Sequence, residues 1–317
     1  MNIKQFLLKA LLLSILTWGT IEAVFIFDPY KKHDLATSYY AIIIDKFQRL
    51  QSLKSPKVVL IAGSNFAYGI NSKMLEDSLK KPVVNMAIHY DYGAKYMLKQ
   101  ISSELRKGDT VIMGFEYIIE SEGNKSEQLL MARYFPKAKE WIEFDDFFED
   151  VRENSQLRIN TFKTVLERLV KSEQITYDIA DTTHIFFRGA TNQYGDLISH
   201  YNNPKLKEIP RAILSDKVSL KDAIANMNDF YTAMKAKGVN VYFVYPTYSK
   251  VNYDLDKKII DKYVKEYNDY AIFPILGTPE DFVFADTLYH DMAYHLTQKG
   301  GDIRTQKIIQ LISKGGK

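Results

Sequence analysis

A serine and a histidine in two distant segments could together carry out nucleophilic chemistry. Ser64 follows the apolar run 58–62 after a single glycine, and His295 stands four residues after Asp291, near the other end of the 317-residue chain. A serine hydroxyl is a weak nucleophile unless a histidine within hydrogen-bond reach takes its proton. An aspartate on the other ring nitrogen would hold the tautomer and stabilise the imidazolium. Together the three side chains could attack an acyl carbon.

The run before Ser64 predicts where that serine lies. Residues 58–62 are apolar and mostly β-branched, which is typical of a buried parallel strand. Gly63 would let the backbone turn sharply, so that Ser64 lies at the carboxyl end of the strand, where open α/β sheets bind their ligands. Amides just after the serine could point at a developing oxyanion. Without a base elsewhere, the same Gly-Ser pair would be an ordinary turn.

Strand and helix patterns alternate along most of the chain, which predicts right-handed crossovers and a parallel sheet. We expect a flavodoxin-like α/β/α domain over 56–317 with a central parallel sheet of about five strands. The expected strands are 58–62, 82–88, 110–117, 239–245 and 271–275, and the expected helices are 71–79, 95–105, 219–237, 253–267 and a last one from about residue 302.

Composition excludes several classes of function. The formal net charge is +3, from 42 basic and 39 acidic residues, and no long basic run occurs, so nucleic acid is not an expected partner. Cysteine is absent, which excludes disulfides, thiolate metal sites and a cysteine nucleophile. The 22 tyrosines and 18 phenylalanines fit either an aromatic core or a sugar-binding surface.

The N-terminus predicts a membrane segment over residues 1–28. An apolar stretch from Phe6 to Phe27 is long enough to span a bilayer, and Lys4 and Lys9 at its start predict a cytoplasmic N-terminus. The main domain would then be extracytoplasmic, joined to the anchor by a connecting helix within 29–55. A cleaved signal peptide is the alternative, although no small-x-small site precedes Ala23. A buried soluble helix is a third interpretation.

The regular pattern loosens between residues 118 and 215, which predicts an inserted helical lobe near the substrate. Helical stretches are expected near 127–133 and 161–170, and the polar, aromatic piece 186–203 could face the cleft. The acidic residues of 143–153 lack metal-site spacing, so we interpret them as a solvated face.

Two segments resemble the SGNH, or GDSL-like, hydrolase family. Gly63-Ser64-Asn65 is similar to its first block, and the segment around Asp291 and His295, read as Tyr-His-Leu-Thr-x-Lys-Gly, is similar to endings in membrane-anchored members of bacterial surface polysaccharide systems. The family spacing of aspartate to histidine is three residues, whereas here it is four. The resemblance covers about 56–120 and 238–315, and it implies Ser64, His295 and Asp291 as the catalytic residues.

The family's oxyanion donors are less well matched. The second block resembles 84–87, with Ala87 or Gly93 in place of the usual glycine, and the third-block Gly-x-Asn-Asp is replaced by 113–117. The remaining candidates to donate to the oxyanion or to bind substrate are Asn65, Asn85, Asn192, Glu116 and Tyr117.

The resemblance implies an extracytoplasmic serine acyl-ester hydrolase or O-acyltransferase acting on an acylated cell-envelope carbohydrate, with a membrane acyl donor as a further partner and no cofactor. The alternative is a catalytically inactive protein of the same fold that binds glycan or serves as a scaffold; the missing third-block asparagine favours it. A metal or phosphate enzyme is disfavoured, because no metal-spaced cluster or phosphate-binding glycine loop occurs in the sequence.

Overall fold

A five-stranded parallel sheet forms the centre of the protein. The computed structural model describes residues 2–173 and 185–315, so residues 174–184 of the expected inserted lobe lie outside the described part. Along the sheet the strands run β2-β1-β3-β4-β6, and each pairs in parallel with its neighbours. In chain order this is the 2-1-3-4-5 arrangement of flavodoxin-like folds, which confirms the expected fold class. The strands are β1 (Val58–Ile61), β2 (Val83–Asn85), β3 (Thr110–Met113), β4 (Asn240–Val244) and β6 (Ile275–Leu276).

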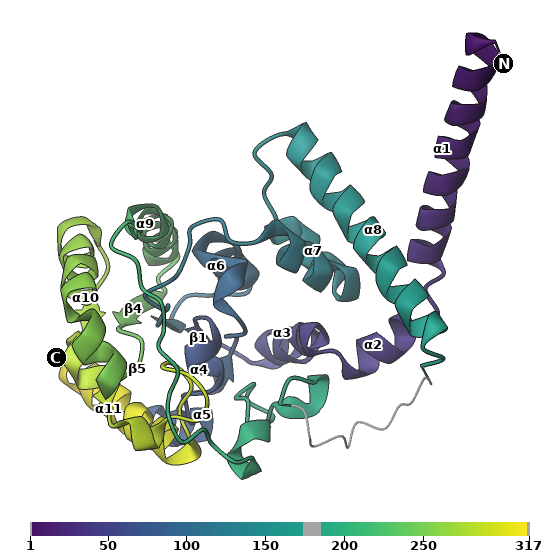
Figure 1. Cartoon of the computed structure of the whole chain (residues 1–317). Helices are drawn as coiled ribbons and strands as arrows, with labels where there is room; N and C mark the ends of the chain where they lie inside the picture. The colour runs from purple at the N-terminus through teal and green to yellow at the C-terminus, as the bar shows by residue number, and fades with distance from the viewer. Residues whose placement is uncertain (1, 174–184, 316–317) are drawn as a thin grey trace.

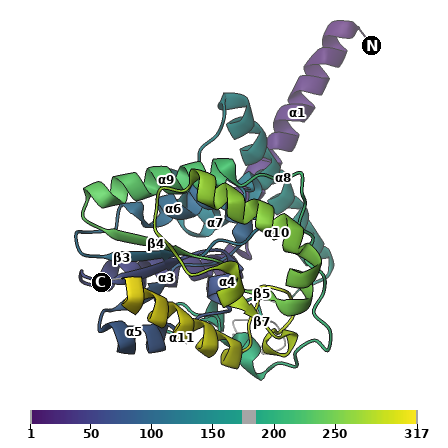
Figure 2. The same ribbon diagram turned by 90° about the vertical axis from the view of Figure 1, so that its left-hand side faces the viewer.

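Helices cover both faces of the sheet, giving three layers (Figure 2). On one side, α5 and α11 pack against each other, and on the other side α9 contacts both α6 and α10. These helices are α5 (Ser72–Leu79), α6 (Ala94–Ser102), α9 (Lys221–Ala236), α10 (Lys250–Tyr270) and α11 (Gln298–Gly315). Because β1, β2 and β3 are buried on both faces, their sequences are continuous apolar runs rather than alternating ones.

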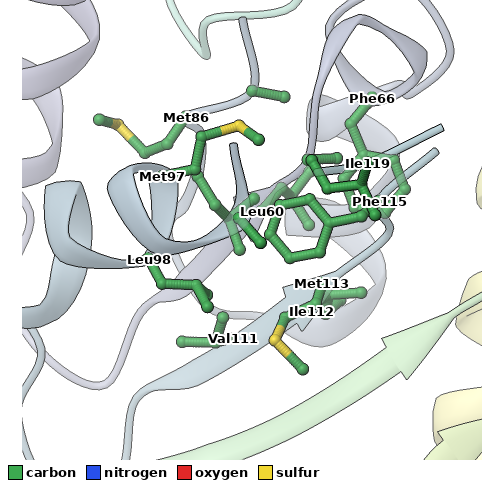
Figure 3. Close-up of a cluster of buried hydrophobic side chains, with 14 of the residues drawn as sticks. Leu60, Phe66, Met86, Met97, Leu98, Val111, Ile112, Met113, Phe115 and Ile119 are labelled. Carbon is green, nitrogen blue, oxygen red and sulfur yellow. The ribbon is translucent and has the colours of Figure 1, made fainter. Parts of the chain in front are cut away.

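The core joins the three layers near the end of β1. Figure 3 shows apolar side chains from β1, β3, α6 and the short helix α4 (Ser64–Ala67) in one cluster. Phe66 packs directly on Gly114, where an added Cβ would lie 2.3 Å from the phenyl ring. A residue without a side chain is therefore required after β3, and this close approach fixes the position of α4 on the sheet.

The segment 29–55, expected as a connecting helix, consists of several helical pieces and contributes to the core of the α/β domain. It forms α2 (Lys31–Thr37), a 3-10 turn (Tyr39–Ala41) and α3 (Ile42–Ser52). Ser38 separates α2 from the 3-10 turn. Its backbone is extended, and its hydroxyl accepts from the Tyr40 N–H at 3.3 Å. The apolar face of α3 is buried in the core of the α/β domain.

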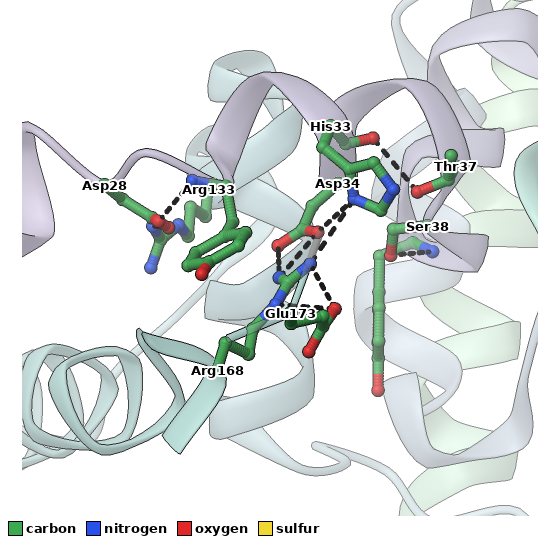
Figure 4. A network of polar contacts seen from close by, with 10 residues as sticks. Asp28, His33, Asp34, Thr37, Ser38, Arg133, Arg168 and Glu173 are labelled. Atoms are coloured by element: carbon green, nitrogen blue, oxygen red, sulfur yellow. Dashed lines mark hydrogen bonds and ion pairs between the residues drawn. The ribbon is translucent and has the colours of Figure 1, made fainter. Parts of the chain in front are cut away.

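The N-terminal helix α1 (Ile3–Ile26) projects from the domain (Figure 1). Within residues 2–173 and 185–315, it is the one helix long and apolar enough to cross a membrane, and none of its residues is buried. Its last turns contact α8 (Phe147–Val170), which also packs on α7 (Lys125–Tyr134). Figure 4 shows the polar network below this contact, in which Arg133 pairs with Asp28 and Arg168 pairs with Asp34 at 2.8 Å.

Several boundaries differ from those expected. The fifth strand is β6 at 275–276 rather than 271–275. Pro274 has no N–H to donate to the neighbouring strand, so the strand starts after it. The Pro274 carbonyl still accepts a hydrogen bond from the Phe243 N–H at 2.9 Å. The last helix begins at Gln298, one turn earlier than expected. Much of the acidic segment 143–153 is the first part of α8. The remaining strands, β5 (Tyr248–Ser249) and β7 (Val283–Phe284), form a separate parallel pair.

Candidate active site

Ser64 lies where the sequence predicts, at the carboxyl end of β1, and it begins α4. This end of β1 faces the switch point of the sheet, since β2 and β3 lie on either side of β1. Only 4% of the surface of Ser64 is exposed, so little of the serine is open to solvent in this structure.

Glu116, which follows β3, holds the turn that carries Ser64. Its two carboxylate oxygens accept from the backbone N–H groups of Gly63, at 3.1 Å, and Asn65, at 2.8 Å. A Cβ on Gly63 would lie 2.5 Å from this carboxylate, so the close contact requires glycine. The Ser64 N–H between these two amides makes no backbone hydrogen bond in the described residues and is left as a potential oxyanion donor.

Asp291 and His295 form the expected pair. The Nδ1 of His295 donates to Asp291 Oδ1 at 2.8 Å, which leaves the lone pair on Nε2. Burial by itself raises the pKa of Asp291, but the hydrogen bond and charge of His295 outweigh it, and the pKa is lowered overall. The carboxylate therefore stays ionised and can orient the imidazole.

His295 contacts Tyr68, the residue that directly follows α4, the short helix that begins at Ser64. The two rings are stacked, with centroids 3.9 Å apart and an angle of 4° between their planes. The Tyr68 N–H in turn donates to the Ser64 carbonyl at 2.9 Å. His295 is 3% exposed, and its Nε2 has no hydrogen-bond partner among the described residues, so Ser64 and His295 do not share a hydrogen bond in this structure.

The other candidate oxyanion donors already make hydrogen bonds within the protein. The Ala87 N–H donates to Asn85 Oδ1 at 3.1 Å, and the Gly93 N–H donates to the Tyr90 carbonyl at 3.0 Å. Asn85 and Asn192 both donate to the buried carboxylate of Asp196, at 2.9 and 3.2 Å. Through Asp196, Asn85 at the end of β2 is hydrogen-bonded to the loop around residue 195. The role of all these candidates as oxyanion donors stays a prediction.

Asn65 is fixed on every side. Its Nδ2 donates to the Gly114 carbonyl at 2.7 Å, and Arg304 on α11 donates to its carbonyl and to its side-chain oxygen, each at 2.7 Å. Arg304 is fully buried, and its guanidinium lies 4.5 Å from the centroid of the Phe66 ring. Burial lowers the pKa of Arg304 to about 9, so the group is charged at neutral pH. Tyr117, also a substrate-binding candidate, is buried and packs on Tyr248, and its role in binding stays a prediction.

Two further histidines form a cluster with Tyr68, and neither is among the residues that the resemblance implies as catalytic. The ring of His200 lies 4.8 Å from that of Tyr68, and the ring of His290 lies 5.2 Å from that of His200. Both are buried, and His290 has no hydrogen-bond partner for either ring nitrogen in the described residues. His200 lies in the polar, aromatic piece 186–203 that could face the cleft, and His290 directly precedes Asp291.

The described residues contain no cluster of three or more histidines, cysteines or carboxylates that could hold a metal ion. A surface cavity of about 180 Å³ lies near the serine turn, next to Tyr90, whose backbone N is 2.7 Å from a Cβ built on Gly63. It is lined by Tyr39, Tyr40, His89, Asp91, Tyr92 and Glu127.

The sheet order defines a flavodoxin-like α/β protein, with a serine at the end of β1 and a hydrogen-bonded Asp291–His295 pair. No model of a known protein family matches this chain, and no curated protein does so either. Among solved structures, the chain is similar to protein YxiM from Bacillus subtilis, with 13% identity, 83% of this chain covered and a TM-score of 0.37. It spans 58% of the length of that protein. It is also similar to a Streptococcus pneumonia protein described provisionally as a platelet activating factor, with 9% identity, 91% of this chain and 97% of that chain covered, and a TM-score of 0.41.

Proposed function

We propose that this protein is a membrane-anchored serine acyl-ester hydrolase or O-acyltransferase, with Ser64 as nucleophile. The observation that carries the proposal is the Asp291–His295 hydrogen bond of 2.8 Å, which leaves a buried Nε2 without a partner on a ring stacked over Tyr68, four residues after the serine. A base with a free lone pair activates a serine hydroxyl once the two come within hydrogen-bond reach.

The reaction needs only side chains already described. The Ser64 Oγ bonds to the acyl carbon as its proton passes to His295 Nε2, and the Ser64 N–H stabilises the oxyanion. The leaving alcohol then departs with that proton, and the acyl group stays on Ser64. Water or a sugar hydroxyl gives up a proton to His295 and attacks the acyl-enzyme, and that proton returns to Ser64. The choice of acceptor separates hydrolase from transferase.

The proposed substrate is an acylated carbohydrate of the cell envelope, on the extracytoplasmic side of the membrane. Buried polar atoms normally have hydrogen-bond partners. Around Tyr68, however, its hydroxyl and ring nitrogens of His200, His290 and His295 have none in the described part of the chain. A ligand with several hydroxyl and carbonyl groups could pair with these atoms only if the side chains that bury them moved aside.

A second candidate function is a protein of the same fold that binds glycan or a protein partner without catalysis. Glu116 favours it, because its carboxylate already occupies the Gly63 and Asn65 amides and would repel an oxyanion beside Ser64. The low exposure of Ser64, at 4%, is consistent with this alternative.

Labelling with a small fluorophosphonate separates the two functions. The full chain in detergent would be treated with the probe, and the adduct located by peptide mass spectrometry. Catalysis predicts an adduct on Ser64 that is lost in Ser64→Ala, is strongly slowed in His295→Ala and is retained in Ser103→Ala, a control at an exposed serine. No adduct on Ser64 in a correctly folded wild-type chain would contradict catalysis and favour the binding protein.

A further inference from the structure

The long helix α8 has three distinct faces along its length. Thr161 and Val165 are buried on the face toward α7. A polar, exposed face carries Arg152, Gln156 and Asn160 at helical spacing. Between these faces runs an apolar row with spacings of three, eight, three, four and three residues, which places its members on one flank of a 3.6-residue helix. The row consists of Phe148, Val151, Ile159, Phe162, Leu166 and Leu169.

The membrane-type helix α1 covers only the middle of α8. Glu22 pairs with Arg158 at 2.6 Å, and the Arg158 guanidinium lies 4.7 Å from the centroid of the Phe25 ring. Arg158 lies beside the apolar row, and Ile159 and Phe162 next to it are half-buried. The last turns of α1 therefore sit on the flank that carries the row.

On either side of this contact the row is uncovered. Phe148 is 79% exposed and Val151 46%, while Leu166 is 50% and Leu169 54% exposed. Figure 1 shows α1 and α8 diverging from their contact, so that the first half of α8 points away from α1. Four large apolar side chains on the side of α1 are thus left uncovered by the residues that the structure describes, 2–173 and 185–315.

We infer that α8 lies along the membrane surface, with its apolar row in the boundary between lipid headgroups and acyl chains. The position of the apolar row favours contact with lipid, because α1 leaves the domain from this same flank of α8. α1 is long and apolar enough to enter the bilayer. An apolar flank beside a charged face is the pattern of helices that lie in the interface. Arg152, with a side chain 71% exposed, could extend its charge toward the headgroups.

The charge at the start of α8 specifies the lipid further. Asp146 caps the helix and accepts from the Glu149 N–H at 2.8 Å, and Asp145 and Asp150 lie close by in the sequence. Carboxylates next to Phe147 and Phe148 would be repelled by an anionic surface. The helix should therefore bind a zwitterionic lipid surface better than an anionic one.

The absence of cysteine allows a direct test with single labels. Phe148→Cys and Leu166→Cys place a label at each end of the row, and Gln156→Cys and Asn160→Cys are matched controls on the polar face. Each full-length variant would carry an environment-sensitive fluorophore and be reconstituted in phosphatidylcholine vesicles that contain a nitroxide lipid. Thermal unfolding in detergent would verify that each labelled variant is folded.

The inference predicts that labels at 148 and 166 lose most of their fluorescence to the lipid quencher, while labels at 156 and 160 lose little. Replacing part of the phosphatidylcholine by phosphatidylglycerol should reduce the quenching at 148. Equal quenching at all four positions would overturn the inference, and so would quenching at only one end of the row, since α8 would then not lie along the surface. Water-exposed labels at both 148 and 166 would overturn it as well, since the row would then be in contact with solvent rather than with lipid.

Discussion

The ring of His295 lies flat on the ring of Tyr68, with centroids 3.9 Å apart and planes 4° apart. Tyr68 ends the short helix that Ser64 begins. The stacking therefore connects the candidate base to the candidate nucleophile without a hydrogen bond between the two. Burial holds the pKa of Tyr68 far above its ordinary value, so the ring stays neutral. We interpret Tyr68 as a positioning residue that sets where the imidazole lies relative to the serine.

Replacing Tyr68 tests this role. Tyr68→Leu removes the flat surface under His295, and if Ser64 is catalytic we expect the rate of fluorophosphonate labelling to fall about 10- to 100-fold through misplacement of the base. Tyr68→Phe keeps the stacked ring and should label at nearly the wild-type rate. Equal losses in both variants would show that the hydroxyl, rather than the stacking, is what matters.

Arg304 should be a main contributor to the stability of the serine turn. Arg304→Met removes two charged hydrogen bonds to Asn65 inside the core, and we expect the free energy of unfolding to fall by about 3 kcal/mol. Arg304→Lys retains the charge but not the planar fork, so an intermediate loss is expected. Denaturant or thermal unfolding in detergent measures both. A loss below that of Arg106→Met, at a partly exposed arginine, would contradict this role.

Lys46 on α3 should stabilise the loop that approaches the end of β2. Its ammonium donates to the carbonyls of Asn85, Ala87 and Gly195 at 3.0, 2.7 and 2.6 Å, and it is 2% exposed. Lys46→Met leaves three buried carbonyls without this donor and should cost about 2 to 4 kcal/mol. The exposed Lys54→Met is the control and should change stability little. Similar melting temperatures for the two variants would refute the expectation.

His200 makes stability depend on pH. Burial lowers its pKa to about 4, although its hydrogen bond to the Leu296 carbonyl acts in the opposite direction. The ordinary value near 6.5 applies to the unfolded chain, so between about pH 6.5 and pH 4 the unfolded state binds more protons. Stability should therefore fall by up to about 3 kcal/mol as the pH drops through this window.

His200→Gln keeps a donor for the Leu296 carbonyl without a titrating group, and its stability should vary less over the same pH range. His89→Gln, at a half-buried histidine, should follow the wild-type curve. Unfolding measured at several pH values between 4 and 7 gives the slopes. An unchanged slope in His200→Gln would assign the pH dependence to other groups.

Local patterns in the sequence predict the architecture of this protein. The apolar runs at 58–62 and 110–117 and the helical spacing between them indicate parallel strands and crossovers, since each depends on neighbours within a few residues. The apolar N-terminal segment is recognised by length and composition. The four-residue spacing of Asp291 and His295 likewise lets the two side chains meet in one loop.

Only the tertiary structure decided what surrounds Ser64. The Glu116 carboxylate on the serine turn, the stacking of Tyr68 on His295 and the Arg304 bonds to Asn65 join segments 51 to 239 residues apart, and no local pattern specifies such contacts. The apolar flank of α8 is visible in the sequence, but which part of it α1 covers depends on how the two helices cross. Side-chain packing between distant segments determines these contacts, whereas hydrophobic periodicity determines the elements that bring the segments together.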